Sequence, residues 1–351
     1  MTRRVRPALV VALIVLLALV PFIGIPLPPI FGEPLRAPGP MTLLAGCFVF
    51  GALALSYDLI FGYAGLLSFG HALYFSIGVY ATAIALQHWH WGLAGSLAFV
   101  MVLSVVLPAI VGAICLRTHG IAFAMVTLAF AQAGSIVVMQ NPLNLTGGEE
   151  GLALSPSVLP AVFAGVANTR NLYWLALALL IFTYAVAAWL IASRPGRVWQ
   201  AIRENERRAA TVGLNPYLFK LGAFVCSSVL ASLAGVVYLF LEGGAAPDIT
   251  TANFTLALLV MVVLGGVGTL WGAVLGGVVY EYLDFRLVVL SSASGLASLP
   301  PVLRIPLSQP LFILGVLFIL LVLFVPGGLA GAVRRLLSSR TILRTTLGRN
   351  S

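Results

Sequence analysis

The amino-acid sequence predicts an all-α fold, a polytopic membrane helical bundle of about ten membrane segments, and three observations support it. Of the 351 residues, 61% are hydrophobic and 8% are charged, whereas about a quarter of the residues in soluble proteins are charged. The mean hydropathy is +1.08. The apolar residues also come in long uninterrupted runs, unlike the short alternating segments of an outer-membrane barrel. So few charges cannot cover a water-exposed surface, which leaves helices that cross a bilayer.

Apolar runs of about 20 residues are long enough to cross the roughly 30 Å hydrocarbon core of a bilayer. We expect the first spans at residues 8–25, 41–61, 72–88, 94–116, 121–140, 172–192 and 220–241. A longer apolar region follows at 254–292, and a last run lies at 308–326. Arginines precede the first run, and prolines follow it where a small-residue cleavage site would lie, which predicts an uncleaved signal anchor.

Positive charge marks one side of the predicted bundle. The net charge is +9, and most of the 19 Lys and Arg residues lie before the first run, between residues 193 and 220, or after residue 333. Cytoplasmic segments carry such an excess, so we expect both termini and the 193–219 segment to be cytoplasmic. The charge then reflects contact with the lipid membrane surface, and we expect no nucleic acid partner.

The same rule divides the long apolar region. The tail is cytoplasmic only if residues 254–292 contribute two passes, or one pass plus a returning half-helix. Several glycines lie between Gly265 and Gly277, and glycine adopts the backbone conformations of a helix break without steric strain from a side chain. We therefore expect glycine-broken or re-entrant helices in this region.

Two counts exclude whole classes of activity. The chain has a single lysine, Lys220, which follows Phe219, so it has no G-x-x-x-x-G-K-[ST] phosphate loop and does not hydrolyse ATP alone. The three cysteines are far apart in apolar surroundings, and the four histidines and ten acidic residues are scattered. We expect no catalytic residues, no metal site and no cofactor bound by this chain, which argues against a membrane enzyme.

The first segment with candidate functional residues runs from Asp58 to Tyr80 and combines glycines with Ser68 and His71. Such glycines indicate either close helix packing or a locally unwound stretch that lines a solute path. Asp58 favours the unwound stretch, because a carboxylate in the membrane costs roughly 2.5 to 3.5 kcal/mol and should face a cavity or a partner. A short cytoplasmic turn over residues 58–71 also satisfies the topology. The candidate path residues in this segment are Asp58, Gly62, Gly65, Ser68 and His71.

A matching G-x-x-G-x-L pattern occurs at residues 62–67 and 265–270, in opposite halves of the chain. Corresponding glycine-broken segments in two halves are typical of a transport site at a repeat interface. This pattern adds Gly265, Gly266, Gly268 and Gly272 to the candidate path residues.

The segment from Ser193 to Lys220 is the longest strongly polar stretch, and it uses 28 residues where a turn needs only a few. Pro195 and Gly196 break the preceding helix, residues 198–212 predict a short amphipathic helix, and Gly213 ends it. Two interpretations stay open at this point. The helix lies flat on the membrane surface, or it docks a cytosolic protein.

Four blocks of sequence resemble one known family. They are SYDLIFGYAG with SFGHA (residues 56–72), LTGGEEGL (145–152), GR with AIRENE, AA and GL (196–214), and MVVLGGVGTLWG (261–272). In this order and spacing they resemble the M-type permease subunit of bacterial branched-chain amino acid ABC transporters, over roughly residues 41–330. Two positions depart from that pattern. Asp58 stands where many members carry Asn, and many carry a Gln near Leu66 or Leu67.

The resemblance implies ABC importer permease architecture: a single transmembrane domain over residues 1–351, a cytoplasmic coupling loop at 193–219 and a basic cytoplasmic tail at 327–351. It implies a multi-pass subunit of the bacterial inner membrane that moves leucine, isoleucine, valine or related amino acids by alternating access. The coupling loop would seat in an ATPase subunit through Arg203, Glu204, Glu206, Arg207, Ala209, Ala210 and Gly213.

The implied partners are a homologous H-type permease, two ATP-binding cassette subunits that bind ATP and Mg, and a periplasmic amino acid binding protein. Two alternatives remain. A related permease type carries urea, so urea or short amides are a possible cargo class. An ion-coupled carrier acting without an ATPase would instead use Asp58, Glu281, Asp284 or Arg286, but the long coupling loop argues against it.

Overall fold

The computed structural model describes residues 15–22, 34, 36–155, 158, 168–291, 309–325 and 327–335. Arg3, Arg4 and Arg6, most of the first predicted run and the tail beyond Arg335 lie outside these residues. Within them, the protein is almost entirely helical. The long helices are α3 (Pro38–Asp58), α4 (His71–Gln87), α5 (Leu93–Cys115), α6 (Ile121–Gln140), α7 (Thr169–Ala192), α10 (Pro216–Glu242), α11 (Ala252–Gly265), α12 (Leu270–Ser291) and α14 (Pro310–Phe324).

These helices confirm the predicted all-α fold and follow the predicted apolar runs closely. The α6 helix spans residues 121–140, the range expected from the sequence, and the other helices begin or end within a few residues of their runs. Among the described residues, five spans are long and apolar enough to cross a membrane: residues 38–63, α5, α6, α7 and α10. Of the first run, residues 15–19 are helical and η1 (Val20–Phe22) follows.

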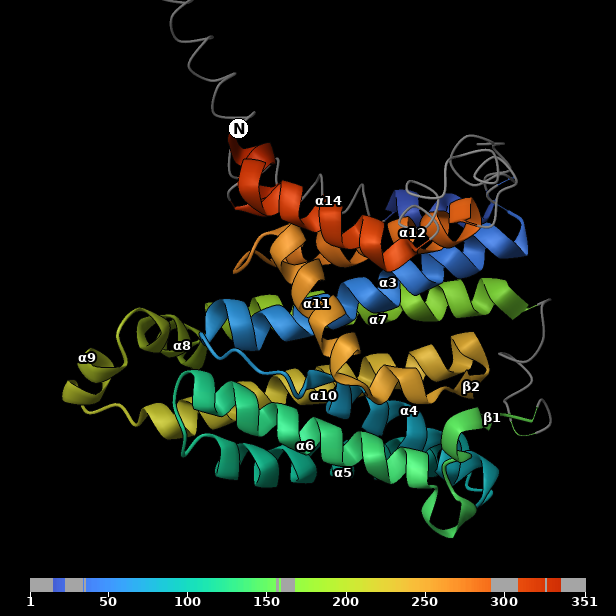
Figure 1. Ribbon diagram of the computed structural model, residues 1–351, viewed down its shortest axis with the longest axis horizontal. Helices are drawn as coiled ribbons and strands as arrows, with labels where there is room; N and C mark the ends of the chain where they lie inside the picture. Colours follow the sequence, from blue (N-terminus) through green and yellow to red (C-terminus); the bar gives the residue numbers. More distant parts are fainter. Residues whose placement is uncertain are drawn as a thin grey trace, which may run out of the picture.

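The long helices form two layers that run along the same direction (Figure 1). One layer contains α3, α7, α12 and α14, the other contains α4, α5, α6 and α10, and α11 crosses obliquely between them (Figure 1). The α3 helix is buried along nearly its whole length, because α7, α10, α11 and α12 all pack on it. By contrast, α5, α6 and α7 keep large apolar side chains exposed, as helices that face lipid do.

Small residues bring α4 and α10 into close contact. A Cβ atom added at Gly78 would collide with the Ser232 carbonyl, and one at Gly235 would collide with the Phe75 carbonyl. The Ser232 hydroxyl donates a hydrogen bond to the Tyr74 carbonyl, 2.7 Å away, across the same contact. Close packing therefore explains Gly78, one of the glycines of the first candidate segment.

The long apolar region breaks where its glycines predict. The α11 helix ends at Gly265 and α12 begins at Leu270, with Gly266 and Gly268 at φ +117° and +73° in the connection. With 14 residues, α11 is about 21 Å long, shorter than the hydrocarbon core, whereas α12 has 22 residues. The region is thus a helix too short to span the hydrocarbon core followed by one that is long enough, joined by a glycine turn.

A short pair of strands closes the end of the bundle opposite the 193–219 segment. Strands β1 (Leu152–Ala153) and β2 (Gly244–Ala245) are antiparallel, with Leu152 opposite Ala245. They lie beside the 3-10 turns η3 (Pro142–Asn144), η4 (Gly148–Glu150) and η6 (Pro247–Thr250). This end ties the loop after α6 to the connection between α10 and α11 (Figure 1).

Gly235 and Gly222 lie on the same helix and provide a test of this packing. We expect Gly235→Ala to lower the free energy of unfolding by about 1 to 3 kcal/mol, because the added methyl group meets the α4 backbone. Gly222 has no neighbour within 4 Å of an added Cβ, so Gly222→Ala should be neutral or stabilising. Thermal denaturation of the detergent-solubilised variants measures both. Equal melting temperatures would contradict the close α4–α10 contact.

Candidate functional site

The polar segment after α7 folds as two short helices at one end of the bundle. They are α8 (Arg194–Glu204) and α9 (Glu206–Thr211). The predicted single helix over residues 198–212 is wrong, because Asn205 adopts an extended conformation at φ −160° and ψ 99°. Its side chain caps α9 by accepting a hydrogen bond from the Arg208 N–H at 2.9 Å. Asn favours such N-cap positions over the interior of a helix.

One face of this pair is anchored on α10. Trp199 is buried, and its Nε1 donates a hydrogen bond to the Phe219 carbonyl at 2.8 Å. Ile202 is buried as well, and Lys220 Nζ forms an ion pair with Glu206 Oε1 at 2.7 Å. The position of α8 and α9 is therefore set by the bundle itself.

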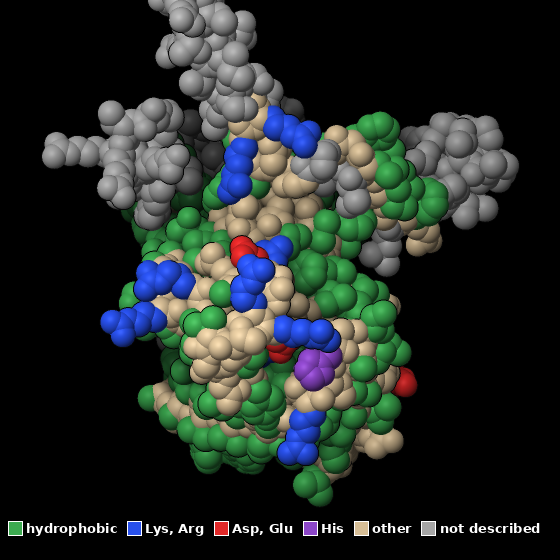
Figure 2. All heavy atoms as spheres, turned by 90° about the vertical axis from the view of Figure 1, so that its left-hand side faces the viewer, with side chains coloured by type: hydrophobic (Ala, Val, Ile, Leu, Met, Phe, Trp, Pro, Cys, Tyr) green, Lys and Arg blue, Asp and Glu red, His purple; other side chains and the backbone are tan. Residues whose placement is uncertain are grey.

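The opposite face is exposed and combines small, apolar and charged residues. Ala201 and Ala210 are exposed, and the Val212 side chain is 76% exposed. Figure 2 looks onto this end of the molecule, where Lys and Arg side chains gather. Of the predicted coupling residues, five are exposed, Glu206 is half-buried and Ala209 is buried; the exposed ones are Arg203, Glu204, Arg207, Ala210 and Gly213.

The first candidate path segment is irregular backbone buried inside the bundle. The regular helix α3 ends at Asp58, a single π-helical turn, η2 (Leu59–Tyr63), follows, and α4 begins at His71. Side chains from other helices satisfy the intervening backbone. Thr127 Oγ1 accepts from the Phe69 N–H at 3.1 Å, Tyr57 donates to the Ser68 carbonyl at 2.9 Å, and Thr255 Oγ1 accepts from the Ala72 N–H at 3.0 Å. Irregular backbone at membrane depth needs such partners.

Ser68 and His71 lie within the packed core in this single chain. Their exposed fractions are 0% and 1%. The His71 Nε2 atom shares a hydrogen bond with Ser56 Oγ at 3.0 Å, and Ser68 Oγ accepts from the Gly70 N–H at 3.2 Å. The Tyr57 ring packs edge-on against His71 at 5.1 Å between centroids. The partners of both side chains are thus protein groups from the same bundle.

Five residues from three separate segments meet next to α8, and we call them the junction: Asp58, Gly62, Gly65, Arg203 and Gly268. Asp58 Oδ1 accepts a hydrogen bond from the Gly268 N–H at 2.8 Å. The Arg203 guanidinium donates to the Gly62 carbonyl inside η2, and its positive charge acts on the Asp58 carboxylate. Asp58 is fully buried, and its Oδ2 has no hydrogen-bond partner among the described residues. Two candidate path segments and one coupling residue are therefore in direct contact.

The junction glycines leave no room for a side chain. A Cβ added at Gly65, where φ is +73°, would lie 2.9 Å from Arg203 Cγ, and one at Gly268 would lie 3.0 Å from Arg203 Nη1. The remaining candidate glycines pack on one another: a Cβ at Gly265 would collide with the Gly272 carbonyl, and one at Gly266 would lie 2.7 Å from the Gly327 carbonyl. Sequence reasoning assigned Arg203 and Asp58 to different functions, and no spacing rule indicated that they meet.

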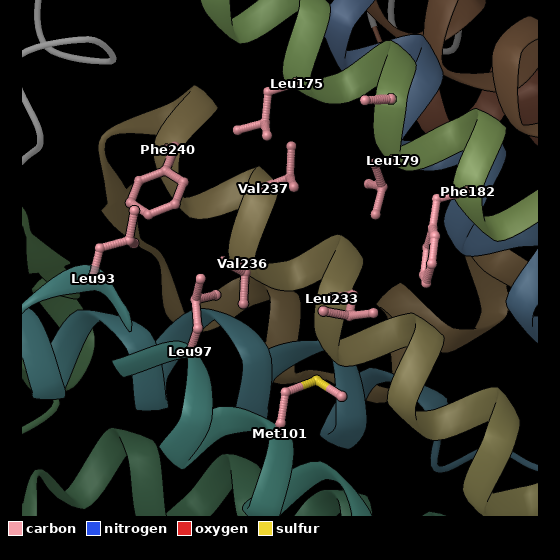
Figure 3. A pocket seen from close by; sticks show the side chains of 11 residues that line it. Leu93, Leu97, Met101, Leu175, Leu179, Phe182, Leu233, Val236, Val237 and Phe240 are labelled. Carbon is pink, nitrogen blue, oxygen red and sulfur yellow. The ribbon is translucent and has the colours of Figure 1, made fainter. Parts of the chain in front are cut away.

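A separate apolar groove of about 520 Å³ opens between α5, α7 and α10 (Figure 3). Leucine, valine, phenylalanine, methionine and alanine side chains line it, including Leu97, Met101, Leu179, Phe182, Val236 and Phe240. This lining offers no charged or hydroxyl group to recognise the carboxylate or ammonium of an amino acid. The groove is therefore not a candidate solute site.

The comparison with protein families decides what kind of bundle this is. A family model described as "Branched-chain amino acid transport system / permease component" matches residues 40–323. The chain belongs to this family. It is therefore a multi-pass membrane protein of a permease family, as the resemblance of its sequence blocks implies. No solved structure matches it significantly.

Relatives of both permease types are similar to this chain. The "High-affinity branched-chain amino acid transport system permease protein LivM" of Salmonella typhimurium is 27% identical over 68% of this chain, which spans 61% of that relative. A probable LivM of Methanocaldococcus jannaschii is 26% identical over 79% of this chain and 89% of its own length. The LivH permease of Salmonella typhimurium is 24% identical over 66% of this chain and 79% of its own length. The M-type relatives thus support the M-type assignment.

Two buried threonines test how the irregular segment is held. We expect Thr127→Val to lower the free energy of unfolding by about 1 to 3 kcal/mol, because the Phe69 N–H loses its acceptor inside the bundle. Thr183 is the matched control: it is equally buried, but its hydroxyl has no partner among the described residues. Thr183→Val should therefore leave the melting temperature unchanged or raise it. Equal losses for both variants would contradict the assigned hydrogen bond.

Proposed function

We propose that this chain is the M-type permease subunit of an ATP-driven importer for branched-chain amino acids, located in a bacterial inner membrane. It forms half of the translocation path and works by alternating access. The single observation that carries the proposal is the α8–α9 pair, which is anchored on α10 and presents an exposed surface that none of the described residues covers. A permease without a phosphate loop of its own needs such a surface for an ATPase.

The ATPase partner supplies ATP and Mg binding in this proposal. Its groove accepts the exposed small and apolar residues Ala201, Ala210 and Val212, and Glu204 and Arg207 frame the contact. The Arg203 guanidinium instead donates to the Gly62 carbonyl of the bundle. The positive charge at this end of the molecule supports its assignment to the cytoplasmic face, and the termini follow the same side. The alternative, a helix lying flat on lipid, leaves the anchoring of α8 and α9 on α10 unexplained.

Further partners follow from the relatives. Both LivM and LivH proteins are similar to this chain, which supports pairing with a homologous H-type permease, so that the path lies between two related subunits. Two ATPase subunits then dock on the two coupling loops, and a periplasmic amino acid binding protein delivers the solute to the opposite face. The single-domain layout, with a coupling loop at 193–219 and a basic tail at 327–351, is part of the same proposal.

Ala210 offers the sharpest test of the docking surface. We expect Ala210→Glu to abolish co-purification of the ATPase subunits and ATP-dependent uptake, because a charged, bulky side chain replaces an exposed small one at the contact. Ala210→Ser keeps the small size and serves as the matched control, with uptake within about twofold of the parent protein. Normal ATPase association by Ala210→Glu would contradict the coupling assignment.

The cargo is tested with this chain, the H-type permease and the ATPase subunits reconstituted together in vesicles. We expect radiolabelled leucine, isoleucine and valine to accumulate when ATP is supplied with the binding protein present, and urea to compete with none of them. Accumulation of urea in place of leucine would favour the amide alternative. Uptake that needs no ATPase and collapses with a proton uncoupler would instead favour an ion-coupled carrier. Either result overturns the proposed cargo or energy source.

A further inference from the structure

The junction has a property that neither docking nor solute binding explains. It joins the ATPase-facing helix α8 to both broken segments of the bundle through two charged side chains, Asp58 and Arg203. We propose that this pair transmits the displacement of α8 to the α11–α12 connection, so that Asp58 is a positioning residue for coupling and not a contact for the solute. The inference rests on the proposed function, since it requires an ATPase that moves α8.

The hydrogen bonds define the route. Arg203, on the last turn of α8, holds the Gly62 carbonyl in the π-helical turn η2. Asp58, at the last residue of α3, holds the N–H of Gly268 in the connection between α11 and α12. The Arg203 guanidinium also lies directly against Gly268. A shift of α8 therefore acts on η2 and on the α11–α12 connection through the side chains of Arg203 and Asp58 alone.

Glycines let the backbone contact the two charged side chains of this route directly. Gly62, Gly65 and Gly268 present bare backbone to the two charged side chains, and an added Cβ at any of them would meet Asp58 or Arg203. The stem of Arg203 lies on Gly65, which only a residue tolerant of φ +73° occupies without strain. Gly62 is buried, so its backbone has little room to yield when the Arg203 side chain that holds it moves.

The buried Oδ2 atom of Asp58 allows Arg203 to form a second set of hydrogen bonds. Oδ2 is buried without a hydrogen-bond partner among the described residues, with the Thr269 backbone N–H and the positive charge of Arg203 near the carboxylate. The Arg203 guanidinium carries five N–H donors. When α8 shifts toward α3, a guanidinium N–H transfers from the Gly62 carbonyl to Oδ2 and the η2 turn is released. An unpaired carboxylate oxygen in the bundle favours that transfer. The junction thus has two discrete states that a movement of α8 selects between.

Three variants and one control separate transmission from docking. Asp58→Asn keeps an oxygen for the Gly268 N–H but removes the charge. Arg203→Met keeps the stem on Gly65 but removes the donors, and the double variant removes both charges together. Arg117→Met is the matched control, an exposed arginine at the same end of the bundle, outside the junction. The full complex with ATPase, H-type permease and binding protein is reconstituted in vesicles for each variant.

The readout is leucine imported per ATP hydrolysed, with co-purification of the ATPase measured in parallel. We expect each single variant to keep the ATPase bound and to lose at least about fivefold in imported leucine per ATP. The double variant should lose no more of the imported leucine per ATP than the single variants, because each of the three disrupts the same Asp58–Arg203 pair. It should also melt at a higher temperature than Arg203→Met, in which the Asp58 charge is left unbalanced. Arg117→Met should stay within about twofold of the parent.

Four results would overturn the inference. They are an unchanged ratio of leucine to ATP, losses that multiply in the double variant, loss of ATPase binding in all junction variants, or a raised KM for leucine with the ratio intact. The last result would indicate that Asp58 contacts the solute. A parent complex that fails to bind the ATPase or to import leucine at all would instead refute the proposed function, which keeps the two failures distinguishable.

Discussion

The hydrogen bond from the Gly268 N–H to the buried Asp58 carboxylate is the contact on which the inner end of this bundle depends. It joins residues 210 positions apart in the chain, and it ties the end of α3, the most deeply buried helix, to the connection between α11 and α12. Without it, the Gly268 N–H would lose its acceptor inside the bundle, and an unsatisfied buried group costs about 1 to 3 kcal/mol. Arg203 completes the arrangement from the cytoplasmic side in our proposal, and the coupling helix α8 is thereby part of the same structure.

The same constraint explains the rest of the irregular backbone. The segment between η2 and α4 runs inside the bundle because hydroxyl groups of Tyr57, Thr127 and Thr255 replace the missing helical hydrogen bonds. Helix α11 is about 21 Å long, shorter than the hydrocarbon core, and the glycines at its end let it fold directly against α12. The unwound segments are thus held by hydrogen bonds and glycine contacts within the bundle, whereas α8 and α9 carry an exposed surface. A permease that is driven from outside needs an open docking face that is tied to its interior.

Much of this architecture was predictable from the sequence, for physical reasons. Helix positions follow from the length of apolar runs, since a bilayer of fixed thickness sets the length of a span. The break near Gly266 was predictable from glycine content together with the charge of the tail. The separation of α8 from α9 was missed because the capping preference of Asn205 acts within one turn and was outweighed by the amphipathic pattern around it. That Asp58 and Arg203 lie at one junction was not predictable, because the proximity of residues 145 positions apart depends on how helices pack and not on local spacing.

The central claim is that α8 and the α11–α12 connection move as one unit, and pulsed electron paramagnetic resonance measures this most directly. In a protein with Cys47, Cys115 and Cys226 replaced, spin labels at Gln200 on α8 and at Val267 are each paired with a label at Arg117, whose segment lies outside the junction. We expect both distances to change together when the complex is trapped with ATP, and only the Gln200 distance to change when Asp58→Asn and Arg203→Met are combined. A Val267 distance that ignores ATP in the parent protein, or that still follows it in the double variant, would contradict the account.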